Sequence, residues 1–161
     1  MLTSDPLAVS SFGELFLRLG LAVVFGLLLG LDREMRGHDA GIRTHALVAL
    51  SSAMIMASSL LLTADLDLGG GDRPDPLRAV QGLAQSIGFI AAGLIFVRGR
   101  SVKNMTTAAN IWIAAAIGIA CGAGQYRIVV VGAALALVLL TVVGALERYL
   151  PSARKEDRSE D

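Results

Sequence analysis

The stretch THALVALSSAMIMASSLLLTA, residues 44–64, runs for 21 residues without an Asp, Glu, Lys or Arg. A bilayer core about 30 Å thick is crossed by about 20 helical residues, at 1.5 Å each. The stretch therefore predicts a transmembrane helix. Its serines favour packing against other helices, because small residues let helix backbones approach closely in a membrane.

Three other segments also lack these four residue types and have spanning length: 79–97, 104–126 and 128–146. A fifth, 19–31, reaches that length if its helix begins near residue 11. The chain is 54% hydrophobic and 17% charged, whereas soluble domains are about 25% charged. We predict an all-α, polytopic membrane bundle of five transmembrane helices in one domain, 1–150. The spans are placed at about 11–31, 44–64, 76–97, 106–124 and 126–148, and residues 151–161 are expected to be a disordered charged tail.

The predicted span 76–97 has two unlike faces. Its large apolar residues form a stripe at helical spacing: Leu83, Ile87, Ile90, Leu94 and Val97. Its opposite side carries small and amide residues: Gln81, Gly82, Gln85, Ser86, Gly88, Ala92 and Gly93. In a bilayer we expect the stripe to face lipid and the small side to pack against other helices. The last span has a single polar residue in its interior, Thr141, and is expected to be the most lipid-exposed.

The basic residues of the loops predict the orientation. Ten Lys and Arg residues follow the first, third and fifth spans, and three lie on the opposite side. Because cytoplasmic loops carry the excess of basic residues, we expect the N-terminus outside and the C-terminus in the cytoplasm. The first and third loops then share the cytoplasmic side.

The first loop, GLDREMRGHDAGIRT (30–44), mixes acids with its arginines. Three interpretations stay open: a salt-bridge network that fixes the helix ends, a polar docking or ion-contact surface, and a catalytic dyad. Asp32 and Glu34 are two residues apart and point to different sides of a helix, which disfavours the dyad. Two groups of candidate residues follow from the two cytoplasmic hairpins: Asp32, Arg33, Glu34, Gly41, Arg43 and Thr44 in the first, and Arg98, Arg100, Lys103, Asn104, Thr106 and Thr107 in the second.

Polar residues at membrane depth are a second group of candidates, because such groups are costly in lipid. Glu14 and Arg18 are four residues apart and can form an ion pair, either structural or functional. The full group is Glu14, Arg18, Gln81, Gln85 and Asn110. Glycines that permit close helix packing form a third group: Gly26, Gly30, Gly88, Gly93, Gly118 and Gly122. These glycines have two possible roles, which are helix packing within one chain and contact between chains.

Four segments together resemble the MgtC/SapB family of bacterial inner-membrane proteins: GLLLGLDRE (26–34), AGIRTHALV (40–48), GFIAAGLIF (88–96) and TTAANIWIAAAIGIACGAG (106–124). The resemblance covers about residues 18–148, and the family has a membrane domain of five spans. One departure is Val102-Lys103-Asn104, where members often have valine, arginine and glycine. Many members continue into a soluble C-terminal domain, and we expect these 161 residues to correspond to the membrane domain alone.

The resemblance implies a link to growth at low magnesium, to virulence, and to restraint of the membrane sector of the ATP synthase. We therefore favour a regulatory or interaction protein of the inner membrane that acts by helix and loop contacts. The expected partners are membrane lipid, a second copy in a homo-oligomer, with a dimer favoured, and a membrane complex such as the ATP synthase. The alternative is a transporter or channel for Mg²⁺ or another small solute.

Composition disfavours other classes. The net charge is zero, with 14 basic and 14 acidic residues, which gives no reason to expect a nucleic-acid partner. One cysteine, Cys121, and two histidines, His38 and His45, are too few for a Cys or His metal site. We expect no enzyme activity, no metal site and no cofactor.

Overall fold

The computed structural model describes residues 11–66, 75–98, 101–144 and 146. The described residues form five α-helices: α1 (Phe12–Met35), α2 (Ile42–Leu66), α3 (Leu77–Leu94), α4 (Met105–Gly122) and α5 (Tyr126–Val138). A π-helical segment, η3 (Leu139–Val143), continues α5. Two short strands, β1 (Phe96–Arg98) and β2 (Ser101–Lys103), lie between α3 and α4. The tail predicted for 151–161 lies outside the described residues.

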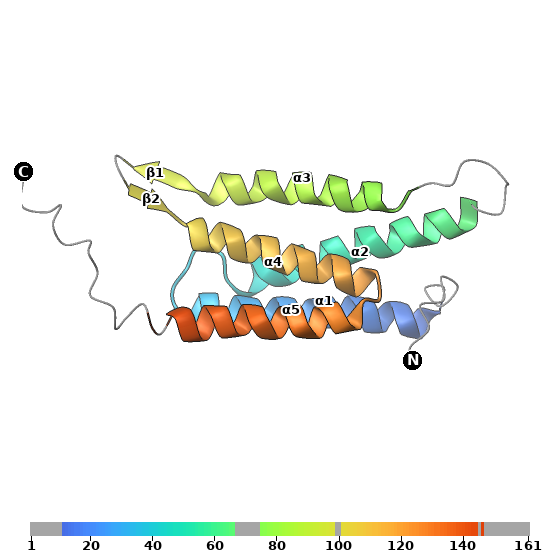
Figure 1. Cartoon of the computed structure of the whole chain (residues 1–161), viewed down its shortest axis with the longest axis horizontal. Helices are drawn as coiled ribbons and strands as arrows, with labels where there is room; N and C mark the ends of the chain where they lie inside the picture. The colour runs from blue at the N-terminus through green and yellow to red at the C-terminus, as the bar shows by residue number, and fades with distance from the viewer. Residues whose placement is uncertain (1–10, 67–74, 99–100, 145, 147–161) are drawn as a thin grey trace, which may run out of the picture.

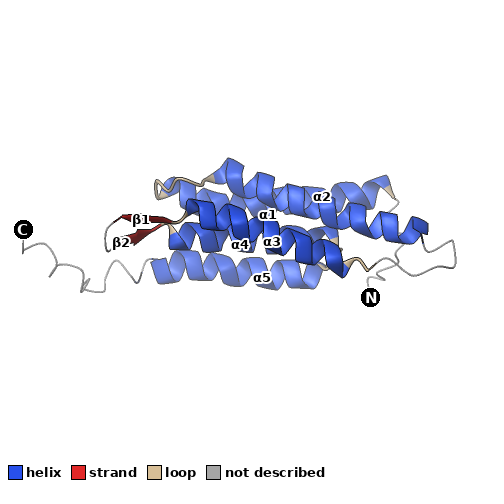
Figure 2. Cartoon of the chain, turned by 90° about the horizontal axis from the view of Figure 1, so that it is seen from above, coloured by secondary structure: helices blue, strands red, loops and turns tan. Residues whose placement is uncertain are grey.

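The helices lie side by side along one long axis (Figures 1 and 2). Four of them are long and apolar enough to cross a membrane: α1, α2, α4 and the continuous helix Tyr126–Val143. The protein is therefore a multi-pass membrane protein. Among these four, Tyr126–Val143 has the smallest buried share, as predicted, and α4 has the largest.

The helix predicted for 76–97 is shorter than expected. α3 ends at Leu94, and Ile95 already has extended backbone angles. Phe96 and Val97 then pair antiparallel with Lys103 and Val102. Aromatic and β-branched side chains favour strands, so these residues form a paired ribbon where the sequence analysis extended the helix.

The predicted orientation of α3 was wrong. Leu83, Ile87 and Ala91 are its buried residues, and Ile87 packs with Ala40, Ile111 and Ala115. The opposite side, with Gln81, Gly82, Gln85, Ser86 and Gly93, is exposed. Van der Waals packing therefore places two residues of the stripe, Leu83 and Ile87, inside the bundle. Leu94 is partly buried, and Ile90 and Val97 are exposed.

α4 is the central helix and contacts α1, α2, α3 and α5. Its contact with α2 is close enough to exclude side chains. A Cβ atom added at Gly118 would collide with the backbone of Ala49, and one at Gly122 with the backbone of Ala53. Glycine at these positions lets the helices approach through their backbones, the usual solution in membrane bundles.

α1 approaches α2 in the same manner. A Cβ at Gly26 would lie 2.7 Å from Ala46 Cα, and one at Gly30 2.6 Å from Ile42 Cα. These glycines therefore pack within the chain. Gly88 and Gly93, in contrast, have nothing within 4 Å of an added Cβ, so the described part of the chain does not use them for close packing.

Candidate functional site

The two predicted hairpins meet at one end of the bundle, where α1 ends and α4 begins (Figure 1). Asn104 Nδ2 donates to Asp39 Oδ2 over 3.0 Å, and the buried Arg33 donates from Nη2 to Thr107 Oγ1. The two hairpins therefore lie at the same end of the bundle, as expected. Among the described residues, the contacts from the second hairpin come from Asn104 and Thr107.

Five of the six residues of the first hairpin lie on helices, and Arg43 and Thr44 belong to the first turn of α2. Asp32, Arg33 and Glu34 belong to the last turns of α1, and the connection to α2 is only residues 36–41. Glu34 Oε2 accepts a hydrogen bond of 3.0 Å from Ile42 N, which satisfies a free N–H group at the start of α2. Gly41 leaves room for this contact, because a Cβ there would displace the Glu34 carboxylate from its present position.

A cavity of about 650 Å³ opens at this end between α1, α4 and α5. This volume is within the usual range for small-molecule sites, about 300–1,000 Å³. One part of its wall is polar and charged, and the other is apolar. The polar residues are Asp32, Arg33, Arg36, His38, Thr106 and Asn110; the apolar side chains include Ile113, Leu135, Leu139, Leu140 and Val143.

Arg33 is the most unusual residue of this cavity. The residue is 4% exposed, and among the described residues its side chain forms a hydrogen bond with the hydroxyl of Thr107 alone. Its Nε has no hydrogen-bond partner, and neither has the buried Oδ2 of Asp32. A buried guanidinium ordinarily has a carboxylate or phosphate partner, and the described residues supply none to the Arg33 side chain.

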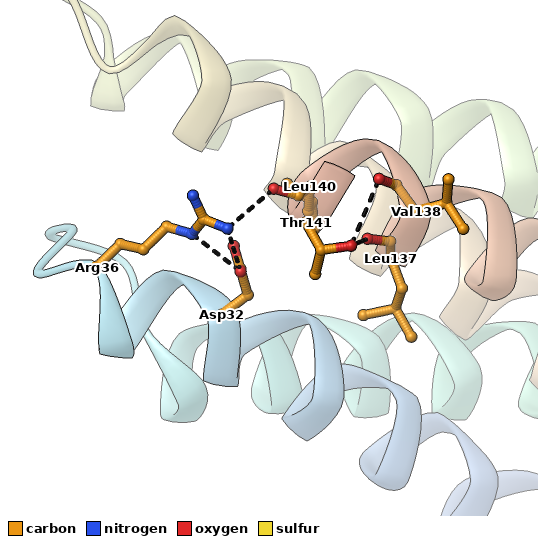
Figure 3. Close-up of polar contacts among 6 residues, drawn as sticks. All are labelled: Asp32, Arg36, Leu137, Val138, Leu140 and Thr141. Carbon is orange, nitrogen blue, oxygen red and sulfur yellow. Dashed lines mark hydrogen bonds and ion pairs between the residues drawn. The ribbon is translucent and has the colours of Figure 1, made fainter. Parts of the chain in front are cut away.

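Arg36 connects α1 to the π-helical segment at the mouth of the cavity (Figure 3). It forms an ion pair of 2.9 Å with Asp32 Oδ1, and its Nη2 donates to the Leu140 carbonyl over 3.2 Å. The carboxylate of Asp32 is therefore already paired with Arg36. Among the described residues that line the polar end of the cavity, two arginines and one aspartate give a net charge of +1.

His38 lies in the connection beside these charges. Its pKa is lowered from the ordinary value by burial and, next, by the charges of Arg33 and Arg36. The ring is therefore mostly neutral at pH 7, and the charge of the cavity at that pH is set by its arginines and Asp32.

Asn110 binds the one buried histidine of the described residues. Asn110 Nδ2 lies 2.9 Å from His45 Nε2, and His45 Nδ1 lies 2.8 Å from the Gly41 carbonyl oxygen. A carbonyl can only accept, so Nδ1 carries the proton and Nε2 accepts from the amide. This is the pattern of a neutral imidazole, and it joins α2 to α4 beside the cavity.

Glu14 and Arg18 form the predicted ion pair at the other end of the bundle. Arg18 Nε lies 2.9 Å from Glu14 Oε1, and its Nη1 donates to the Gly122 carbonyl over 3.0 Å. Tyr126 donates to the same carboxylate oxygen. The pair therefore joins α1 to the end of α4 and the start of α5, which is a structural arrangement.

The remaining predicted residues are dispersed. Thr106 lines the cavity, while Arg43 and Lys103 are exposed and Thr44 is partly buried on the first turn of α2. Gln81 and Gln85 lie on the exposed face of α3. Arg100 and the side chain of Arg98 lie outside the described residues. The described residues contain no group of three or more His, Cys, Asp or Glu that could hold a metal ion.

Sequence reasoning did not select four residues of these sites: Arg36, His38, His45 and Tyr126. Arg36 had a usable signal, because it follows Asp32 by four residues on a helix. His45 and Asn110 each lie in a predicted span without charged residues, and strongly polar groups at membrane depth are expected to hydrogen-bond across helices. The contacts of His38 and Tyr126 depend on the fold and have no local signal.

Comparison with known proteins gives a family for this arrangement. The model of the MgtC family matches residues 19–149. The chain belongs to the MgtC family. It is 39% identical over 129 residues to the "Putative magnesium transporter YhiD" of Escherichia coli K12, covering 80% of this chain and 60% of YhiD.

Other MgtC family relatives give similar values. Protein MgtC of Brucella abortus is 37% identical over 80% of this chain and 49% of its own length. An uncharacterized Synechocystis protein, slr0014, is 34% identical over 86% of this chain and 56% of its length. The chain thus spans about half to three fifths of the relatives it matches. No solved structure matches it.

Proposed function

We propose that the chain is a magnesium-related regulatory protein of the bacterial inner membrane that acts by contact, without catalysis. Family membership supports the link to magnesium. The partner that the family resemblance implies is the membrane sector of the ATP synthase. The observation that carries the contact mechanism is the exposed face of α3.

We also propose that α3 is the fifth span, with the N-terminus outside and the charged cavity at the cytoplasmic side. α3 has 18 residues, or about 27 Å of helix at 1.5 Å per residue. It lies alongside the four apolar helices (Figure 2), and the excess of basic residues at the cavity end supports the orientation.

The exposed face of α3 carries amides that lipid cannot satisfy. Gln81 and Gln85 are exposed, and an unpaired amide is costly in hydrocarbon. Gly82 and Gly93 leave open space for a close neighbour. A glutamine amide both donates and accepts, so identical residues can pair across a two-fold axis. The proposed occupant is the same face of a second copy.

Disulfide cross-linking in native membranes tests this contact. Ser86→Cys, in a Cys121→Ala background, places one thiol on the proposed face, and Val142→Cys places one on the exposed side of η3. We expect a cross-linked dimer from Ser86→Cys and none from Val142→Cys. A strictly monomeric protein with no co-purifying membrane complex would contradict the proposal.

The regulatory role has its own test. ATP-driven proton pumping by inverted membrane vesicles should fall when the chain is present and recover with Gln81→Leu/Gln85→Leu, which replaces both amides. Vesicles containing Arg127→Gln, changed at an exposed residue outside this face, serve as the control. Equal pumping with and without the chain would contradict the regulatory role.

The alternative is a magnesium transporter, which the name of YhiD favours. Two observations weigh against it in this chain. The close glycine contacts seal α4 against α2, and Arg33 and Arg36 place positive charge at the cavity, where a cation would enter. Uptake into liposomes loaded with a magnesium-sensitive dye tests it. Flux that is lost on Asn110→Leu or Gln85→Leu would establish the transporter.

A further inference from the structure

The charged cavity has the form of a site for an amphiphile. One end carries Arg33, Arg36 and His38, and the other is lined by apolar side chains of α4, α5 and η3. α1 has 24 residues, about 36 Å of helix, against a hydrocarbon core of about 30 Å. The last turns of α1 therefore reach the depth of lipid headgroups, and the apolar wall extends from there into the acyl-chain region.

The charge of the polar end selects the headgroup. Asp32 is paired with Arg36, and the described residues offer no carboxylate within ion-pair distance of the buried Arg33. When His38 is neutral, the described residues at the polar end carry a net charge of +1. The single negative charge of one phosphodiester balances it. Thr106, which is exposed and lines the cavity, adds a hydroxyl that can donate to the same anion.

The apolar end selects a lipid tail. Leu135 and Leu139 line the cavity and remain exposed, and Gly132 has nothing within 4 Å of an added Cβ. The gap beside Gly132 is therefore unfilled by the described part of the chain. In a bilayer a space of this kind is filled by hydrocarbon, because an empty void loses its van der Waals contacts.

We propose that this cavity is a specific binding site for one anionic phospholipid. Its phosphodiester lies against Arg36 and Thr106, over the buried charge of Arg33, and one acyl chain lies along Ile113, Leu135 and Leu139. The site does not depend on the proposed regulatory role, since it requires only that the bundle is embedded in a membrane.

Native mass spectrometry of the full chain, released from detergent after delipidation, tests the site. Phosphatidylglycerol and phosphatidylcholine with the same acyl chains are titrated separately. We expect one phosphatidylglycerol to be retained at concentrations at least tenfold lower than phosphatidylcholine. Equal retention of the two lipids, or no retained lipid, would overturn the proposal.

Variants separate the two ends of the site. Gly132→Phe fills the apolar end and should abolish the preference for phosphatidylglycerol, whereas Gly88→Phe, at an equally open glycine of α3, should preserve it. Arg33→Gln should also abolish the preference for phosphatidylglycerol. Should the Arg33→Gln variant fail to fold, Gly132→Phe alone decides the test. A preference that survives Gly132→Phe would exclude this cavity.

A free anion is distinguished by competition. Inorganic phosphate supplies the anionic oxygens without an acyl chain. We expect millimolar phosphate to leave the lipid bound, because it cannot occupy the apolar wall. Displacement of phosphatidylglycerol by phosphate at those concentrations would show a simple anion site and overturn the assignment of a lipid.

Discussion

The two sides of α4 use small residues in opposite ways. Toward α2, Gly118 and Gly122 lie against the backbones of Ala49 and Ala53, and a single added carbon would collide. On the side of α4 that faces α5, Gly132 of α5 borders a cavity and has room for a side chain. The same residue type seals one interface and leaves the other open. Glycine spacing therefore predicts that backbones can approach, and only the fold decides whether they do.

The largest expected effect on stability comes from adding a methyl group at Gly118, compared with the same change at Gly132. Gly118→Ala should lower the free energy of unfolding by at least about 2 kcal/mol, because it forces α2 and α4 apart. Gly132→Ala should be neutral or stabilise by about 0.5–1 kcal/mol, since alanine favours helix. Equilibrium unfolding in mixed micelles measures both. Equal effects would remove the contrast between the two sides.

The next largest effect is expected from the hydrogen bond between Asn110 and His45, which joins α4 to α2. Asn110→Leu leaves the buried His45 Nε2 without its donor and should cost about 1–2 kcal/mol. A double-mutant cycle with His45→Phe isolates the pair, and we expect a coupling of about 1 kcal/mol. Additive effects of the two changes would show that the hydrogen bond contributes nothing to the α2–α4 contact.

Arg36 sharpens the account of the open side. Arg36→Gln removes the ion pair with Asp32 and weakens the connection of α1 to η3. Because the pair is only partly buried, we expect a loss of about 1 kcal/mol or less. Arg43→Gln, at an exposed residue on α2, is the control and should change unfolding very little. A loss from Arg43→Gln as large as that from Arg36→Gln would contradict the assignment.

The smallest effect is a pH dependence from His38. Burial, and then Arg33 and Arg36, lower its pKa in the folded protein, so the unfolded chain binds the proton more tightly. The contribution of neutral His38 to the free energy of unfolding is therefore fully present above the pKa of the unfolded chain, about 6.5. It is lost as the pH falls through the pKa of the folded protein. His38→Gln should flatten the pH dependence of unfolding below about pH 6.5. An unchanged profile would show that His38 is not the group that titrates.

The sequence predicted what depends on local pattern. Charge-free runs located α1, α2, α4 and the last span within a few residues, because length and hydropathy are read directly. The ion pair of Glu14 with Arg18 followed from helical spacing. The orientation of α3 could not be obtained this way, since both of its faces are compatible with a membrane and the surface of α4 decided between them.

The candidate site was only partly predictable. Asp32, Arg33 and Thr107 were selected from the two hairpins, and the fold brings them together. The cavity itself depends on where α5 lies relative to α4, which no local pattern encodes. The burial of Arg33, without a carboxylate partner in the described part of the chain, is likewise a property of the packed bundle.

Quenching by brominated lipids most directly tests whether the cavity between α1, α4 and α5 binds an anionic lipid. The chain has one tryptophan, so Leu139→Trp in a Trp112→Phe background places a single fluorophore in the cavity wall. Val142→Trp in the same background places it on exposed surface outside the cavity. We predict stronger quenching of Trp at 139 by brominated phosphatidylglycerol than by brominated phosphatidylcholine at equal mole fraction, with no difference at 142. Equal quenching by both lipids at both positions would contradict the account.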